Sequence, residues 1–159
     1  MRLALIPLLL LSALSVVGCQ PHADASADLD RIRDTVVLYD ELLAEGYTSM
    51  DMSPLTGVAT EAHVQELYHH MAALGGAGIR MEPELLELRF ENVDSCGEGL
   101  AKVETTEAWR YVHVNTSDEM PAYTVVENQT YELSYDLTKY NDTWLVSSVT
   151  VLDENSGTP

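Results

Sequence analysis

The sequence predicts an α+β domain. Two helices, or three if a short turn near residues 53–58 is counted, pack on a curved four-stranded antiparallel sheet to give a cone-like shape. Apolar residues recur at helical spacing in the first half of the chain. In the second half they alternate with polar residues, as in strands that bury one face. The connections between these strands are too short for crossovers, so neighbouring strands must be antiparallel. Helices that precede such a meander pack together on one face of the sheet.

The first predicted helix covers residues 29–45. Its apolar stripe has helical spacing and consists of Leu29, Ile32, Val36, Tyr39 and Leu43. We expect the opposite face to lie in solvent, and it carries Arg31, Asp34, Asp40, Glu41 and Glu45. Asp28 or Asp30 is placed to cap the N-terminus, and Gly46 is placed to end the helix.

The second predicted helix covers residues 60–74. Thr60 suits an N-cap, because its hydroxyl can accept a hydrogen bond from a free backbone N–H group. The apolar stripe consists of Val64, Leu67, Tyr68 and Met71. A glycine-rich run at 75–78 ends the helix. Residues 47–59, between the two helices, are predicted to be a loop in which Ser53 and the proline after it start one helical turn.

Four strands follow the helices. We predict them at residues 86–94, 100–114, 123–139 and 143–152. Their connections are a tight turn, a polar loop and a hairpin, at 95–99, 115–121 and 140–142. One face of the first strand is expected to carry Leu86, Leu88 and Phe90. One face of the third is expected to carry Tyr131, Leu133, Tyr135 and Leu137. We expect the tail, residues 153–159, to be disordered.

The beginning of the chain resembles a bacterial lipoprotein signal peptide. Arg2 precedes an apolar core that ends in small residues directly before Cys19. In such a lipobox, residues 1–18 are removed and the Cys19 thiol takes a diacylglyceryl group, so that membrane lipid becomes a partner. The alternative is an ordinary signal peptide followed by a chance cysteine.

The residues after Cys19 refine the expected location. Gln20 stands where aspartate would signal retention in an inner membrane, so the sequence favours an outer membrane, with the domain facing the periplasm. A Gram-positive host would place it on the outer face of its single membrane. Residues 19–27 are predicted to be a lipidated tether and residues 28–152 the domain. If Cys19 is acylated, Cys96 has no partner within the chain, and we interpret it as a turn residue.

The charge of the chain limits its partners. Lys and Arg number 8 against 26 Asp and Glu, a net charge of −18. Such a surface repels the phosphate backbone of nucleic acids, which we therefore exclude as partners. It also repels anionic lipid headgroups, so charge does not hold the domain at a membrane. The acidity either attracts cationic partners or serves solubility.

Three segments resemble the nuclear transport factor 2-like superfamily: residues 101–111, 131–137 and 144–146. They combine a strand that ends in Trp-Arg-Tyr, a Tyr-x-Leu-x-Tyr-x-Leu strand and a Trp-x-Val strand. The resemblance covers roughly residues 29–152 and implies a cone, with a curved antiparallel sheet wrapped around helices. The superfamily includes isomerases, cyclases, dehydratases and many binding domains, so its name does not give a function.

That resemblance also implies an acid or base inside the cone. On the second strand, alternation places Val103, Thr105, Glu107, Trp109, Tyr111 and His113 on one face. If this face is concave, Glu107 and His113 are candidate catalytic residues. Candidate ligand-binding residues are Trp109, Tyr111, Tyr131 and Tyr135. The alternative is structural: the aromatic side chains form the core, and Glu107 pairs with a neighbour or faces water.

Metal and cofactor sites are not expected. His63 and Glu66 stand three residues apart on the second helix, which is a weak likeness to a helix-bundle metal motif. His69 and His70 lie near the C-terminus of that helix, where the helix dipole favours imidazolium. The sequence also lacks a phosphate-binding glycine loop and a serine nucleophile elbow.

These observations lead to three hypotheses for function. The first is a non-enzymatic, membrane-anchored lipoprotein whose domain binds an unknown protein or small ligand. The second is an enzyme of the isomerase or dehydratase type, with an acid/base residue in the cone. The third is a structural envelope protein that forms homodimers through its sheet.

Overall fold

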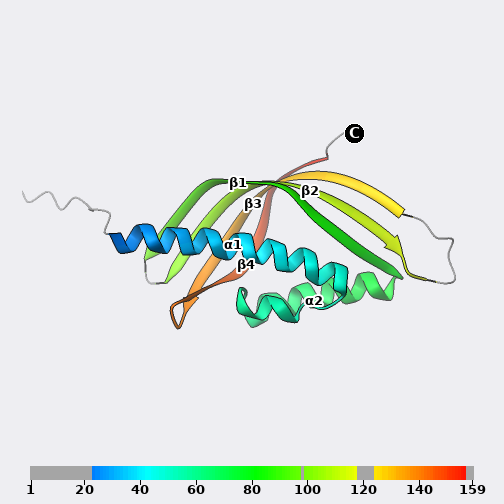
Figure 1. Cartoon of the computed structure of the whole chain (residues 1–159), viewed down its shortest axis with the longest axis horizontal. Helices are drawn as coiled ribbons and strands as arrows, with labels where there is room; N and C mark the ends of the chain where they lie inside the picture. The colour runs from blue at the N-terminus through cyan, green and yellow to red at the C-terminus, as the bar shows by residue number, and fades with distance from the viewer. Residues whose placement is uncertain (1–22, 98, 118–123, 157–159) are drawn as a thin grey trace, which may run out of the picture.

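The computed structural model describes residues 23–97, 99–117 and 124–156, and it confirms the predicted α+β fold. Its elements are α1 (Ala23–Ser49), the 3₁₀ helix η1 (Ser53–Gly57), α2 (Glu61–Gly76), β1 (Ile79–Gly97), β2 (Leu100–Asn115), β3 (Thr124–Tyr140) and β4 (Thr143–Ser156). The four strands form one antiparallel sheet in the order β1-β2-β3-β4. The sheet arches over α1 and α2, which both lie on its concave side (Figure 1).

Helix α1 is longer than predicted at both ends. It begins at Ala23, so residues 23–27 of the predicted tether are helical, while residues 19–22 lie outside the described part of the chain. It also continues past Gly46 to Ser49, so the prediction that Gly46 ends the helix is wrong. A Cβ on Gly46 would lie 2.7 Å from the Met52 sulfur. The glycine therefore permits a close approach of the returning chain.

After α1 the chain doubles back, so that α2 runs in roughly the same direction as α1 (Figure 1). The return passes through η1, which confirms the predicted helical turn. Thr60 caps α2 as predicted, accepting a hydrogen bond from the His63 N–H at 3.4 Å. The Thr60 N–H in turn donates to the Val146 carbonyl at 2.9 Å, which holds the start of α2 against β4.

The first strand begins earlier than predicted and contains irregularities. β1 starts at Ile79 and pairs with β2 along its whole length. The pairing shifts register between Leu85 and Glu87, so Leu86 is left in a bulge and is 53% exposed. The prediction that Leu86 shares a face with Leu88 is therefore wrong, because the bulge inverts the alternation at that point.

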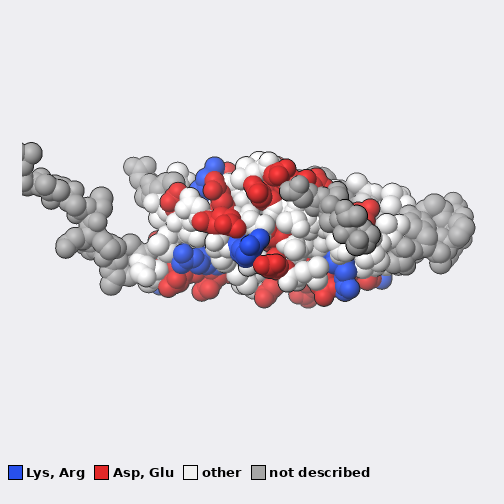
Figure 2. Space-filling model, turned by 90° about the horizontal axis from the view of Figure 1, so that it is seen from above, with Lys and Arg blue, Asp and Glu red and all other residues white. Residues whose placement is uncertain are grey.

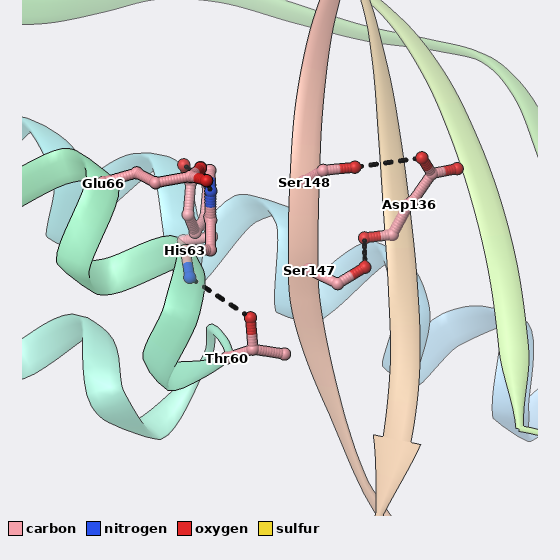
Figure 3. A network of polar contacts seen from close by, with 7 residues as sticks. Thr60, His63, Glu66, Asp136, Ser147 and Ser148 are labelled. Atoms are coloured by element: carbon pink, nitrogen blue, oxygen red, sulfur yellow. Dashed lines mark hydrogen bonds and ion pairs between the residues drawn. The ribbon is translucent and has the colours of Figure 1, made fainter.

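Strands β3 and β4 form a tight hairpin that extends further than predicted. Asn141 and Asp142 both have positive φ angles, 46° and 63°, as in a type I′ turn. β4 runs to Ser156, so residues 153–156 are not a disordered tail, and residues 157–159 lie outside the described part. A bulge in β4 is held by Asp136, whose carbonyl and carboxylate accept hydrogen bonds from Ser147 and Ser148 (Figure 3).

The hydrophobic core lies between α1, η1 and the concave face of the sheet. Its fully buried large members include Ile32, Val36, Met52, Leu55, Val103, Leu137 and Val146. Each such side chain contributes roughly 1.5–3 kcal/mol by leaving water. Tyr68 lies outside the core at 53% exposure, so the prediction that it belongs to the apolar stripe of α2 is wrong.

The outer surface is strongly acidic. Seen from above the sheet, acidic side chains predominate and the few basic ones lie among them (Figure 2). None of the helices in the described part of the chain is both long and apolar enough to cross a bilayer.

Candidate functional site

A cavity of about 560 Å³ lies between the two helices and one half of the concave sheet face. Helix α1 contributes Tyr39, Asp40, Leu43 and Tyr47 to its lining, and α2 contributes His63, Leu67 and His70. The strands contribute Met81, Pro83, Glu107, Trp109, Tyr111, His113, Glu127, Tyr131, Leu133, Tyr135, Val149, Val151 and Glu154. The volume falls in the range of roughly 300–1,000 Å³ that is typical of small-molecule sites.

The cavity brings together all six candidate residues predicted on the strands. Glu107, Trp109, Tyr111 and His113 of β2 line it beside Tyr131 and Tyr135 of β3. The shared face is therefore the concave one. The pairing of β2 with β3 has no register shift, so the alternation holds along both strands. Cys19 lies outside the described residues.

Glu107 is fully buried and its carboxylate is satisfied within the protein. One oxygen, Oε1, accepts hydrogen bonds from the hydroxyls of Thr105 and Tyr135, both at 2.7 Å. The other, Oε2, accepts from the indole N–H of Trp109 at 2.8 Å. Three donors from the same sheet hold this carboxylate in place, so it is a poor candidate for a general base.

Asp40 faces Glu107 across the bottom of the cavity. It was predicted to lie in solvent, and that prediction is wrong: only 1% of its surface is exposed. Its Oδ1 lies 3.0 Å from the hydroxyl of Tyr135, and its Oδ2 has no hydrogen-bond partner among the described residues. Burial raises the pKa of Asp40 well above its ordinary value, and the negative charge of Glu107 raises this pKa further.

One arrangement of protons satisfies this group of side chains. The hydroxyl of Tyr135 has a single proton, although it lies within hydrogen-bond distance of both carboxyl groups. If Asp40 is protonated, it donates to the Tyr135 oxygen, and Tyr135 donates to Glu107. The Oδ2 atom of Asp40, which is buried, then remains without a donor among the described residues.

Two tyrosine–histidine pairs connect the helices along one side of the cavity. The hydroxyl of Tyr39 lies 2.8 Å from Nε2 of His63, and the two rings are stacked at 5.7 Å. The hydroxyl of Tyr47 lies 2.6 Å from Nδ1 of His70. Burial raises the pKa of Tyr47 to about 12.

His63 is held from both sides of its ring. Its Nδ1 faces an oxygen of Glu66 at 3.5 Å (Figure 3). Because Nε2 lies against the hydroxyl of Tyr39, a proton on Nδ1 satisfies both contacts. The predicted weak metal motif of His63 and Glu66 is thus a pair joined by a hydrogen bond. Within the described residues, no group of three or more His, Cys, Asp or Glu side chains is placed to hold a metal ion.

The rim of the cavity combines tyrosines with glutamates. Across the pairing of β2 with β3, Tyr111 stands opposite Glu127. Across the pairing of β3 with β4, Tyr131 stands opposite Glu154. The rings of Tyr111 and Tyr131 meet edge to face at 6.4 Å. The ring of His113 also stacks on that of Tyr111, at 6.5 Å between centroids.

The two predicted catalytic candidates do not form one acid–base pair. Six residues of an extended strand separate Glu107 from His113, a distance of about 20 Å. Glu107 lies at the bottom and accepts three hydrogen bonds, whereas His113 lies at the rim. The group at the bottom with an unused oxygen is Asp40.

Sequence reasoning missed the residues that the helices contribute. Asp40, His63 and His70 line the cavity, whereas Asp40 was predicted to lie in solvent and neither histidine was assigned to a ligand cavity. The signal for Asp40 was its spacing, since it follows Val36 by four residues and Ile32 by eight on the buried stripe.

Comparisons with known proteins show the fold alone. No family model matches the sequence, and no curated protein matches it. Among solved structures, the chain is similar to the crystal structure of the intermembrane space region of chloroplast protein ARC6. The TM-score is 0.67 at 18% sequence identity, and the match covers 79% of this chain and 96% of that one.

Proposed function

We propose that this domain binds a small, largely apolar molecule in the cavity between its helices and its sheet. The observation that carries the proposal is the lining, in which aromatic and aliphatic side chains surround a few fixed polar groups. This is the usual composition of a ligand site. Glu107 accepts three hydrogen bonds from its own neighbours, which hold its carboxylate in place and make it a poor general base.

Binding of the neutral dye N-phenyl-1-naphthylamine tests this proposal. We expect its fluorescence to rise with saturation at one site per chain. Val149 lines the cavity and is half-buried, so Val149→Phe fills part of the volume and should weaken dye binding at least about five-fold.

Val126→Phe is the matched control, because Val126 is 57% exposed and pairs with Val112 on the outer face of the sheet. Both variants must retain the circular dichroism of the parent. Equal dye affinity of the two variants would contradict binding in this cavity, and so would an absence of saturable binding to the parent.

A second candidate function, acid–base catalysis of the isomerase or dehydratase type, is favoured by one observation. Asp40 lines the cavity, and its Oδ2, which is buried, has no partner among the described residues. A carboxyl group in such surroundings can exchange a proton with a bound molecule.

A generic probe for this activity is 5-nitrobenzisoxazole, whose ring opens when a carboxylate removes its proton. We expect acceleration that increases with pH and is lost in Asp40→Asn; equal rates for parent and variant would exclude this role.

For the location of the domain, we propose that lipid on Cys19 anchors the chain at a membrane. Support comes from the lipobox at the start of the sequence and from an acidic surface that anionic headgroups repel. In a bacterial host, Cys19→Ser should move the protein from the membrane to the soluble fraction. Continued membrane fractionation of the variant would exclude lipid on Cys19 as the tether.

A further inference from the structure

We propose that the molecule bound in this cavity is an organic cation, whose charged nitrogen lies at the rim formed by Tyr111, Glu127, Tyr131 and Glu154. Its apolar body would occupy the aromatic interior. The inference rests on the proposed function and names the chemical class of the ligand.

The charge of the cavity lining favours a cation. Four carboxyl groups line the cavity, those of Asp40, Glu107, Glu127 and Glu154, and its lining contains no Lys or Arg. Five of the seven Lys and Arg side chains that the structure describes pair with acids elsewhere: Arg33, Arg80, Arg89, Arg110 and Lys139. Within the described ranges, Glu127 and Glu154 have no basic partner. A cation at the rim would supply the missing counter-charge.

The arrangement of the aromatic rings also suits a cation. Each rim tyrosine stands directly opposite a rim glutamate in the sheet, and the rings of Tyr111 and Tyr131 lie edge to face. Trp109 stacks beside Tyr111 at 6.1 Å. Aromatic faces next to carboxylates are the surroundings in which ammonium groups bind, because ring quadrupole and carboxylate attract the same charge.

The rim of the cavity suits a cation better than the bottom does. Glu107 is already satisfied by three donors, and burial raises the pKa of Asp40. An ammonium group at this depth would lose its water in exchange for a neutral acid and an occupied carboxylate, which is unfavourable. At the rim it keeps part of its hydration. Asp40 lines this deeper end of the cavity, which therefore suits the uncharged end of the ligand.

A pair of isosteric probes tests the inference. 3-Hydroxyphenyltrimethylammonium carries a cationic nitrogen, and 3-tert-butylphenol has a neutral carbon in its place. Both are smaller than the cavity, and they differ only in the charge of the quaternary centre. By isothermal titration at low ionic strength, we expect the cation to bind about ten-fold more tightly. Added salt should reduce this preference, because the rim is exposed.

Matched variants locate the preference. The double variant Glu127→Gln with Glu154→Gln should lose most of the ten-fold preference and retain its affinity for 3-tert-butylphenol. Glu104→Gln with Glu132→Gln removes the same charge from the outer face, where these residues pair with Ser134 and Thr106, and should keep the preference. An equal loss in both double variants would mean that the net charge of the chain, and not the rim, attracts the cation, and would overturn the inference.

The outcomes distinguish this inference from the function on which it rests. Equal affinity of the parent for both probes overturns the cation inference and leaves the ligand site in place. Binding of N-phenyl-1-naphthylamine without binding of the cation has the same meaning. If neither the dye nor either probe binds, the proposed function itself fails.

Discussion

Asp40 on α1 and Glu107 on β2 are joined through a single hydroxyl group, that of Tyr135, at 3.0 Å and 2.7 Å. All three side chains are almost completely buried. This contact ties the helix layer to the middle of the sheet at the bottom of the cavity. It also places two carboxyl groups so close together that ionisation of one makes ionisation of the other unfavourable.

Removal of that hydroxyl should destabilise the domain. Tyr135→Phe keeps the packed ring but leaves Asp40 with no partner and Glu107 with one donor fewer, and we expect a loss of about 2 kcal/mol in the free energy of unfolding. Urea denaturation followed by circular dichroism measures it. Tyr140→Phe is the control, because Tyr140 is 68% exposed, and it should change stability by less than about 0.5 kcal/mol. A similar effect of both changes would contradict the bridging role of Tyr135.

The pH dependence of stability should contain a contribution from Asp40. Its pKa is raised by burial, so the folded protein holds this proton more tightly than the unfolded chain. The stability it contributes is therefore full below the ordinary pKa of 3.8 and is lost as pH rises through the folded pKa. The titratable groups that act on it are Tyr39, Glu107 and Tyr135, together with the neighbouring Glu41 on the same helix.

Asp40→Asn isolates this contribution. The amide keeps the shape of the side chain and cannot ionise, so between about pH 4 and pH 8 the variant should lose less stability than the parent. Urea denaturation of the parent and of Asp40→Asn at each pH gives the difference between their free energies of unfolding. Contributions from the other acids are common to both proteins and cancel in this difference. Identical pH profiles would show that Asp40 does not hold its proton in the folded state.

The cavity face of the central strands was predictable because their pairing is regular. β2 and β3 match residue for residue from one end to the other, so alternation in the sequence becomes alternation in space at Glu107, Trp109, Tyr131 and Tyr135. β1 lacks this regularity. Its bulge at Leu86 depends on the pairing with β2, which no local pattern reveals.

The helix side of the cavity was not predictable to the same degree. Asp40 is buried because Tyr135, which is distant in the sequence, provides a hydrogen bond that offsets part of the cost of its burial. His63 is buried in the same manner against Tyr39. For polar residues like these, position on the helix indicates burial only once the partner on another element is known.

The turn between α2 and β1 should require a glycine. Gly78 has a φ of +72°, and a Cβ at that position would lie 2.8 Å from the Cβ of Ser117. Gly78→Ala should therefore cost about 1–3 kcal/mol through backbone strain and contact. Gly76→Ala is the matched control, since no atom lies within 4 Å of its Cβ, and it should be neutral or slightly stabilising. Equal thermal midpoints of the two variants would contradict this account.

The N-terminal part of α1 should be held to the sheet by Asp28. Its carboxylate accepts hydrogen bonds from Lys139 Nζ, at 2.9 and 3.2 Å, and from the indole N–H of Trp144 at 3.2 Å. Asp28→Asn should cost about 1 kcal/mol. Asp30→Asn is the matched control, because Asp30 pairs with Arg33 on the same helix and both side chains are exposed. This variant should lose almost no free energy of unfolding.

The pH dependence of the Asp28 contact follows from its pKa. The hydrogen bond from Lys139 lowers the pKa of Asp28, so the unfolded chain binds this proton more readily than the folded one. The stability that Asp28 contributes is present above its ordinary pKa and is lost as pH falls through the lower, folded value. The difference between the parent and Asp28→Asn should therefore be constant near neutral pH and shrink in acid. A difference that grew in acid would show that the carboxylate is not the form that holds Lys139.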